Sequence, residues 1–287
     1  MDNPPTFERG VPAPIGVFDS GVGGLTVLRA LARTLPDERF LYLGDTARLP
    51  YGTKTADTVV RYSVQCAGLL VQRGVKALVV ACNTASSVAL PALAAAYPGI
   101  PVLGVVEPGA DAAIRATGKG HVAVIATEGT VRGGAYVRAL QSLDPAVRVT
   151  QVPCALFVAL AEEGWTDGVV VEAVARRYLE AVFAGSDAPD TLLLGCTHFP
   201  VLAPALRRVV GDDVMLVDSA ATTALAMARL LGKSVPVESA MPGPAAVADS
   251  GTRFHFLATD GLERFARVGA TFLGTPIAPQ ALELVDL

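Results

Sequence analysis

The sequence predicts an α/β fold of two similar parallel-sheet lobes, related by pseudo-twofold symmetry, with a functional site in the cleft between them. Two stretches carry this prediction, ALVVACNT (77–84) and LLLGCTHFP (192–200), because each is an apolar run that ends in a cysteine. Strands buried on both faces read as unbroken apolar runs, and α/β proteins place their chemistry at the carboxyl ends of such strands. The following residues also match, since VALPAL (88–93) resembles VLAPAL (201–206). A repeat of this kind indicates two copies of one unit.

Composition narrows the class of protein. The 287 residues are 52% apolar, enough for one large or two small packed domains. A net charge of −4 gives no general attraction to nucleic acid or to an anionic membrane. Every apolar stretch is interrupted well before the roughly 18 residues that a membrane-spanning helix needs. Residues 1–14 lack the features of a signal peptide, and the four cysteines form no CxxC pair, so we expect reduced thiols in the cytoplasm.

The first predicted strand, Ile15–Phe18, ends at Asp19 and Ser20. The glycines of GVGG then lead into a helical pattern, LTVLRALARTLP (25–36). A helix N-terminus exposes unpaired N–H groups and favours anions, while the plain alternative for Asp19 is a helix N-cap. GVGG does not have the spacing of the dinucleotide-binding fingerprint GxGxxG.

The rest of the chain alternates between strands and helices. After a strand at 40–43, the Gly-, Pro- and Thr-rich GDTARLPYGTKT reads as a binding loop with Tyr51 and Gly52 in its middle. Further strands are expected at 75–81, 101–106, 121–126, 147–152, 192–195, 214–217 and 253–260. Helices are expected at 56–74, after 84 as far as 93, and at 169–184, 203–210, 221–231 and 261–274. Residues 236–249, rich in Pro, Ala and Ser, read as a loop.

VAVIATEGTVRGGAYVRAL (122–140) repeats IGVFDSGVGGLTVLRAL (15–31) and places Thr127 opposite Asp19. Glu162 ends an apolar run, so it is either part of a solvated helix face or a carboxylate of the site. The two remaining cysteines and two remaining histidines read as structural residues: Cys66, Cys154, His121 and His255.

Two thiols from facing lobes suit the inversion of a carbon that carries an acidic hydrogen. One group removes the proton from one face, and the other donates a proton to the opposite face. A free thiol has a pKa near 8.5, so each needs activation, with Asp19 the candidate helper of Cys82 and His198 that of Cys196. One alternative is that the cysteines are only small buried hydrophobes. Another is a metal site of Cys82, Cys196 and His198, which has no further ligand at metal-binding spacing.

Five ordered motifs, FDSGVGGLTVLRAL, LGDTARLPYGTKT, ACNTASS, VEPG and LLLGCTHFP, resemble those of the glutamate racemase family, within the cofactor-independent aspartate/glutamate racemase superfamily. The resemblance runs from about Ile15 to the C-terminal helix. It implies that Cys82 deprotonates D-glutamate and Cys196 deprotonates L-glutamate, assisted by Asp19 and His198. The substrate-binding residues that it implies are Asp19, Ser20, Tyr51, Gly52, Asn83, Thr84, Thr127, Thr130, Glu162, Thr197 and His198.

The resemblance also implies racemisation with no cofactor and no metal, a glutamate substrate, a homodimer, and a cytoplasmic role in supplying D-glutamate for peptidoglycan. It implies a discontinuous first lobe, 12–106 with 220–287, and a second lobe, 107–219. CALFVAL (154–160) departs from the family's CPLFVPL, because Ala155 and Ala159 replace prolines in the backbone that leads to Glu162.

Two other readings are open. Aspartate racemases of the superfamily carry a Glu at the position of His198 and a His at that of Ser86, so both positions here favour glutamate. A binding or regulatory protein could keep the fold without catalysis. The paired cysteines argue against it, because the loss of either one would end racemisation.

Overall fold

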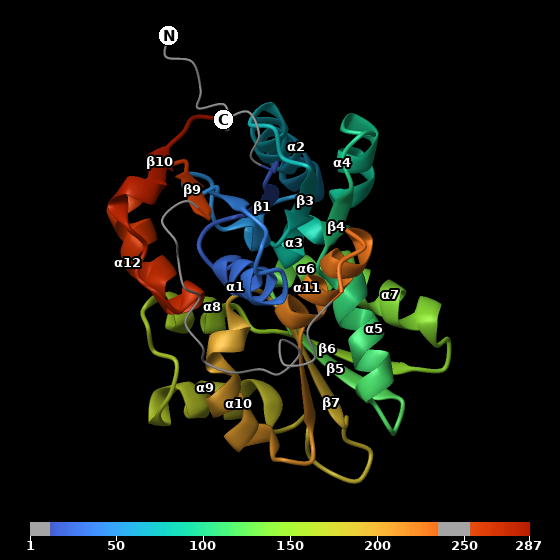
Figure 1. The fold of residues 1–287 in the computed structure, drawn as a ribbon. Coiled ribbons are helices and arrows are strands. Elements are labelled where there is room, and N and C mark those ends of the chain that lie inside the picture. Colours follow the sequence, from blue (N-terminus) through green and yellow to red (C-terminus); the bar gives the residue numbers. More distant parts are fainter. Residues whose placement is uncertain (1–11, 235–252) are drawn as a thin grey trace.

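The computed structural model describes residues 12–234 and 253–287, and it contains two parallel sheets (Figure 1). The first sheet has the strand order β10-β9-β2-β1-β3-β4, and the second has the order β6-β5-β7-β8. The order 2-1-3-4 of the first sheet therefore recurs as 6-5-7-8 in the second. The duplication read from the sequence is also a duplication of topology, and the predicted fold class is confirmed.

The first sheet is built from β1 (Ile15–Asp19), β2 (Phe40–Gly44), β3 (Ala77–Val80), β4 (Val102–Gly104), β9 (Phe254–Ala258) and β10 (Leu282–Leu284). The second is built from β5 (His121–Ala126), β6 (Arg148–Pro153), β7 (Thr191–Gly195) and β8 (Met215–Asp218). The strand expected at 101–106 is shorter than predicted, because a helix already begins at Val106. The EPG motif (107–109) thus lies inside a helix and does not follow a strand end.

The helices that follow the strands of the first half are α1 (Leu25–Thr34), α2 (Ala56–Gln72), α3 (Asn83–Ser86), α4 (Leu90–Ala96) and α5 (Val106–Ala116). Those of the second half are α6 (Glu128–Gly133), α7 (Ala135–Leu143), α8 (Ala155–Glu162), α9 (Val169–Leu179), α10 (Ala203–Val210), α11 (Ser219–Leu230) and α12 (Leu262–Leu273). The described residues also include the short 3-10 turns η1 (Tyr51–Thr53), η2 (Phe199–Leu202) and η4 (Pro279–Ala281). The helix expected at 169–184 ends at Leu179. The loop expected at 236–249 and most of the tail 1–14 lie outside the described residues.

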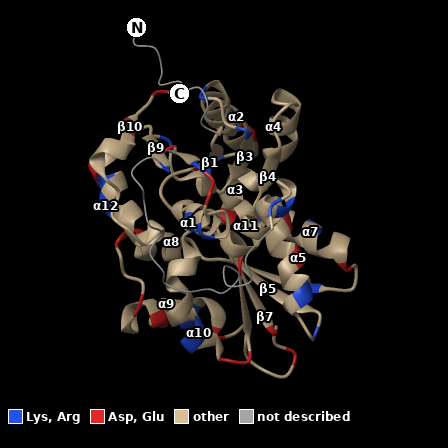
Figure 2. Ribbon diagram, in the orientation of Figure 1, with Lys and Arg blue, Asp and Glu red and all other residues tan. Residues whose placement is uncertain are grey.

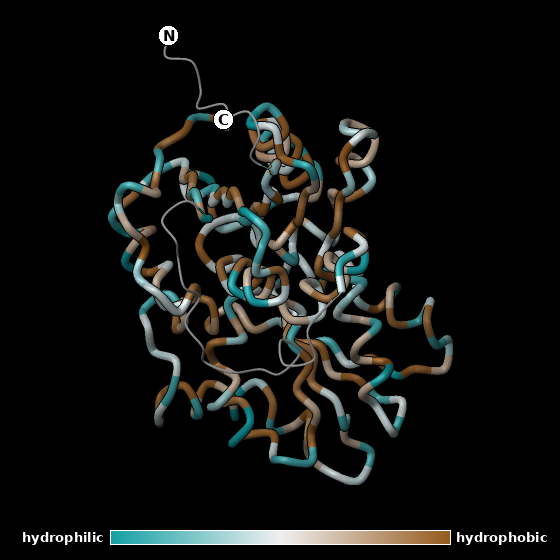
Figure 3. Tube along the Cα trace, in the orientation of Figure 1, coloured by the Kyte–Doolittle hydropathy of each residue, from teal (hydrophilic) through white to brown (hydrophobic). Residues whose placement is uncertain are grey.

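The inner strands β3 and β7 are buried along their whole length because both faces of each sheet are covered there. In β3, Ala77 and Val79 pack into one apolar cluster, while Leu78 and Val80 pack into another on the opposite face. In β7, Leu192 and Leu193 divide in the same way. Successive side chains of a strand point to opposite faces, so a strand buried on both sides has no polar positions to alternate with. The apolar character of the strands is visible in Figure 3.

One apolar cluster runs through both lobes. It contains Val17 of β1, Leu194 of β7 and buried positions of α1 and α11, among them Leu28 and Ala224. Figure 1 shows α11 between the two sheets. α11 also packs on α5, the first helix of the second lobe, so α11 holds the two lobes together.

The chain returns to the first sheet at its C-terminal end, because β9 pairs with β2 and β10 pairs with β9. We therefore propose the division into a discontinuous lobe, 12–106 with 220–287, and a continuous lobe, 107–219. Basic and acidic residues occur in both lobes (Figure 2). Within 12–234 and 253–287, no helix is both long enough and apolar enough to cross a membrane.

Candidate active site

A pocket of about 340 Å³ lies between the lobes and collects most of the predicted site residues. The predicted residues that line it are Ser20, Tyr51, Gly52, Cys82, Asn83, Thr84, Thr127, Glu162, Cys196, Thr197 and His198. Asp19 and Thr130 are outside this lining, at 1% and 0% exposure. Asp19 and Thr130 can therefore influence the pocket only through the lining residues that they contact.

Sequence reasoning missed several lining residues: Gly21, Leu49, Pro50, Thr53, Glu128, Ala155, Val158 and Ala159. Leu49, Pro50 and Thr53 belong to the GDTARLPYGTKT loop, which the composition did identify as a binding loop. Ala155, Val158 and Ala159 lie on α8, and nothing in an apolar run distinguishes a pocket wall from packed core.

Cys82 directly precedes α3 and acts as its N-cap. Its sulfur accepts a hydrogen bond from the Ala85 N–H at 3.5 Å, and its S–H donates to the Ser20 hydroxyl at 3.7 Å. Burial, together with the negative charge of Asp19, raises the pKa of the Cys82 thiol to about 12. Cys82 therefore carries its proton at neutral pH in the free site.

Asp19 ends β1 and is buried beneath the same region. Its Oδ2 accepts a hydrogen bond from the Gly21 N–H at 3.0 Å, while its Oδ1 has no hydrogen-bond partner among the described residues. Burial raises the pKa of Asp19, against the lowering effect of His198. The N-cap of α1 is Gly24, with no side-chain cap, so Asp19 does not cap α1.

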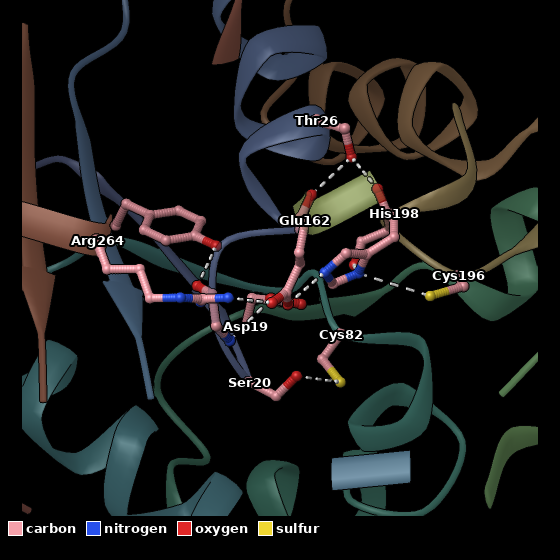
Figure 4. Close-up of polar contacts among 12 residues, drawn as sticks. Asp19, Ser20, Thr26, Cys82, Glu162, Cys196, His198 and Arg264 are labelled. Atoms are coloured by element: carbon pink, nitrogen blue, oxygen red, sulfur yellow. Dashed lines mark hydrogen bonds and ion pairs between the residues drawn. The ribbon is translucent and has the colours of Figure 1, made fainter. Parts of the chain in front are cut away.

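Cys196 and His198 follow β7, and they lie side by side (Figure 4). The Cys196 sulfur is 3.8 Å from His198 Nδ1, and Glu162 Oε1 is 3.1 Å from His198 Nε2. Burial alone would lower the pKa of His198, but its hydrogen bonds with Cys196 and Glu162 outweigh burial and raise it to about 10. An imidazolium therefore stands beside the Cys196 sulfur.

Glu162 is a carboxylate of the site and does not belong to a solvated helix face. Its side chain is 16% exposed, and its two oxygens contact His198 and Arg264. The hydrogen bond with His198, aided by Arg264, lowers the pKa of Glu162 to about 2 against the effect of burial. With alanines at 155 and 159, α8 is an unbroken helix over Ala155–Glu162, and Ala155, Ala159 and Glu162 all line the pocket.

Three threonine hydroxyls join the lobes beside Cys82. Thr84 Oγ1 is 3.1 Å from Thr127 Oγ1 and 3.3 Å from Thr130 Oγ1. Thr127 is the N-cap of α6, one position after β5 ends. Since β1 ends at Asp19, the strand ends make Thr127 the counterpart of Ser20, one position away from the expected match with Asp19.

Two predicted polar side chains donate hydrogen bonds to residues outside the pocket lining. The Tyr51 hydroxyl donates to Asp45 Oδ2, so the backbone and ring of Tyr51 are what the pocket meets. Asn83 Nδ2 donates to the Tyr136 hydroxyl at 2.7 Å across the lobe interface. Asn83 Oδ1 is buried with no hydrogen-bond partner among the described residues, which leaves an acceptor available at the pocket wall.

The other predictions concern structural residues. Cys66 and Cys154 are buried free thiols outside the pocket lining. His121 contacts the Asp187 carbonyl and Thr150, and His255 contacts Glu283, all outside that lining. Ser86 bonds to the backbone of Val80 and Val105. In the described ranges, no group of three or more His, Cys, Asp or Glu side chains is placed to hold a metal ion.

Comparison with known proteins places this geometry in context. Residues 15–227 match the Asp/Glu/Hydantoin racemase family. Glutamate racemase of Geobacter metallireducens is 48% identical over 260 residues, covering 91% of this chain and 92% of the relative. The relative from Koribacter versatilis is 46% identical over 287 residues, covering 95% and 97%. The crystal structure of Francisella tularensis glutamate racemase with D-glutamate has a TM-score of 0.82 at 34% identity, covering 96% and 97% of the two chains.

Proposed function

The chain belongs to the Asp/Glu/Hydantoin racemase family, and we propose that it interconverts L- and D-glutamate by proton transfer between Cys82 and Cys196. Its sequence identity of 46–48% to glutamate racemases, over 91–95% of the chain, shows that it is a glutamate racemase enzyme, an isomerase. The two-thiol mechanism is supported by one observation above all. Each cysteine follows a central strand of its own sheet, and both line one pocket from opposite lobes.

In each turnover, the sulfur of one thiolate takes the α-proton, so an S–H bond forms as the Cα–H bond breaks. The other thiol gives its proton to the opposite face of the α-carbon, and its S–H bond breaks as the new Cα–H bond forms. The site ends with the two protonation states exchanged, ready for the other enantiomer. No electrons are gained or lost, so this step needs no oxidant or reductant. By resemblance to the family, Cys82 acts on D-glutamate and Cys196 on L-glutamate.

The two halves of the free site differ in protonation. His198 is an imidazolium beside Cys196, whereas Cys82 holds its proton. A positive charge beside Cys196 suits the thiolate that would take the α-proton of L-glutamate. For D-glutamate, Cys82 first has to lose its proton, and Asp19 is the nearest candidate acceptor because burial has raised its pKa. We assign Asp19 to the Cys82 half and His198 to the Cys196 half on this basis.

The substrate would be held by hydrogen bonds more than by ion pairs, because no Lys or Arg is among the described residues that line the pocket. Hydroxyls of Ser20, Thr84, Thr127 and Thr197 can donate to the carboxylates. The free Asn83 Oδ1 can accept from the ammonium group. The volume falls in the range of about 300–1,000 Å³ that is usual for small-molecule sites.

Three further points follow from the resemblance and are part of the proposal. D-glutamate made by this chain would serve peptidoglycan synthesis, the protein would work in the cytoplasm, and two copies would form a dimer. Light scattering of the purified protein would test the dimer directly. The pocket itself does not separate glutamate from aspartate, so aspartate belongs in any activity test.

The test is proton NMR in D2O with L-glutamate, D-glutamate and L-aspartate in turn. The variants are Cys82→Ser and Cys196→Ser, with Cys154→Ser as a buried cysteine control outside the pocket. We expect the wild-type protein and Cys154→Ser to exchange the α-proton of both glutamate enantiomers, so that its signal is lost. Cys82→Ser and Cys196→Ser should not racemise glutamate. Exchange on aspartate alone would move the assignment to aspartate racemase. No exchange by a folded protein would leave a non-catalytic binding protein.

A further inference from the structure

Arg264 is a residue that the proposed reaction does not yet use. Its Nη2 donates to Glu162 Oε2 at 2.9 Å, and the other oxygen of Glu162 is 3.1 Å from His198 Nε2. His198 Nδ1 is in turn 3.8 Å from the Cys196 sulfur. Figure 4 shows these side chains as one continuous series, from α12 to the thiol.

This series of contacts crosses between the lobes. Glu162 and His198 follow strands of the second sheet, whereas Arg264 lies on α12, which follows β9 of the first sheet. The same helix places Phe272 edge-on against the His198 ring, with the ring centroids 5.1 Å apart. One helix of the first lobe therefore acts on the imidazole of the second lobe by two contacts.

Arg264 and His198 each contact one oxygen of the Glu162 carboxylate. A carboxylate with one partner can rotate about its Cγ–Cδ bond, whereas a partner on each oxygen fixes the plane. The Arg264 side chain is 48% exposed and that of Glu162 is 16% exposed. Arg264 therefore holds Glu162 from the solvent side, and Glu162 contacts the buried His198. We propose that Arg264 is a positioning residue for Cys196: it fixes Glu162, which orients the imidazole that exchanges a proton with the thiol. This inference rests on the proposed function.

The effect of Arg264 should be confined to one half of the site. The Cys82 sulfur forms hydrogen bonds with Ser20 and Ala85, and among the described residues neither of these is bonded to Arg264. Racemisation rates cannot show this asymmetry, because enantiomers have an equilibrium constant of unity. The kcat/KM values of the two directions must then fall equally, whichever thiol is impaired.

A reaction that needs only one base can measure the activity of Cys82 and that of Cys196 separately. From 3-chloroglutamate, a single thiolate removes the α-proton while chloride leaves the β-carbon with its electron pair and a C=C bond forms. The resulting enamine hydrolyses to 2-oxoglutarate and ammonium, which an enzymatic assay detects. The enantiomer whose elimination is lost in Cys196→Ser reports on Cys196, and the one lost in Cys82→Ser reports on Cys82.

We expect Arg264→Gln to slow elimination on the Cys196 side about fivefold, the scale of an exposed ion pair, and to leave the Cys82 side unchanged. Arg264→Lys should recover part of the rate. Arg267→Gln, an exposed arginine on the same helix with no contact to Glu162, is the matched control. In a Glu162→Ala background, Arg264→Gln should have no further effect, because Arg264 acts through Glu162.

Equal slowing on both sides would overturn the inference, since it would indicate a general effect on the closeness of the lobes. A persistent effect of Arg264→Gln in the Glu162→Ala background would overturn it as well. Failure of the proposed function has a different signature, in which the wild-type protein neither racemises glutamate nor eliminates chloride.

Discussion

Gly23 of the first lobe lies directly against His198 of the second. A Cβ atom built on Gly23 would come within 2.4 Å of His198 Nδ1 and 2.5 Å of Thr197 Oγ1. The glycine-rich turn after β1 is thus needed for close approach of the two lobes. It is not a cradle for a phosphate group. The imidazole beside Cys196 can occupy its place only because residue 23 has no side chain.

Replacing Gly23 by Ala should therefore displace His198 and lower racemisation by at least tenfold. The backbone of Gly23 needs no left-handed conformation, so the clash is the cause. Gly99→Ala, where an added Cβ meets nothing within 4 Å, is the control. Glutamate turnover in both variants, with thermal unfolding to confirm the fold, is the measurement. Full activity of Gly23→Ala would contradict the contact.

The protonated state of His198 should depend on Glu162. The folded pKa is about 10 against an ordinary 6.5, so the stability that the imidazolium contributes is complete below about pH 6.5 and is lost as the pH rises through 10. An NMR titration should find His198 still cationic at about pH 8. Glu162→Gln should bring its midpoint down, because one of the groups that raise the pKa is removed. An unchanged midpoint would rule out this coupling.

The Glu162 carboxylate has the opposite pH dependence. Its folded pKa is about 2 against an ordinary 4.5, so its contribution to stability is present above about pH 4.5 and declines as the pH falls through 2. The unfolding free energies of wild type and Glu162→Gln should therefore converge on acidification over this window. Denaturant unfolding at several pH values is the measurement. If the ion pair contributed nothing, the unfolding free energies of the two proteins would differ by the same amount at every pH.

Tyr136 supports Asn83 from across the lobe interface. Tyr136→Phe removes the acceptor of a buried hydrogen bond of 2.7 Å and leaves Asn83 Nδ2 unpaired. We expect a loss of about 1–3 kcal/mol in unfolding free energy and a raised KM for glutamate. Tyr178→Phe, whose hydroxyl makes a longer, exposed contact with Leu156, is the control and should cost less. Equal stability losses in the two variants would count against this role of Tyr136.

The four thiols should react with iodoacetamide in a definite order. Cys196 stands beside an imidazolium, Cys82 holds its proton, and Cys66 and Cys154 do not line the pocket. Since the thiolate is the nucleophile, Cys196 should be alkylated first and Cys82 second. His198→Gln should slow the reaction at Cys196. Peptide mass spectrometry over time would detect the reverse order, which would refute this difference between the halves.

The amino-acid pattern is sufficient to locate most of the strands and the two cysteines of the pocket. Strands that are covered on both faces consist of short apolar runs. In a duplicated unit, the residues that follow these strands are repeated as well. Ala77–Val80 and Thr191–Gly195 could therefore be located, and Cys82 and Cys196 placed at equivalent strand ends, without any structure.

The pairing of side chains around the two thiols is visible only in the folded chain. Arg264 and Glu162 are 102 positions apart, and no periodicity records a contact at that separation. Local pattern also could not show that the Tyr51 hydroxyl turns to Asp45 or that Asp19 lies behind the pocket wall. Periodicity reports which face of an element is buried, whereas the partner of a polar group depends on how the lobes meet. In this protein, the lobes meet where α11 packs on α5 and where α12 contacts Glu162 and His198.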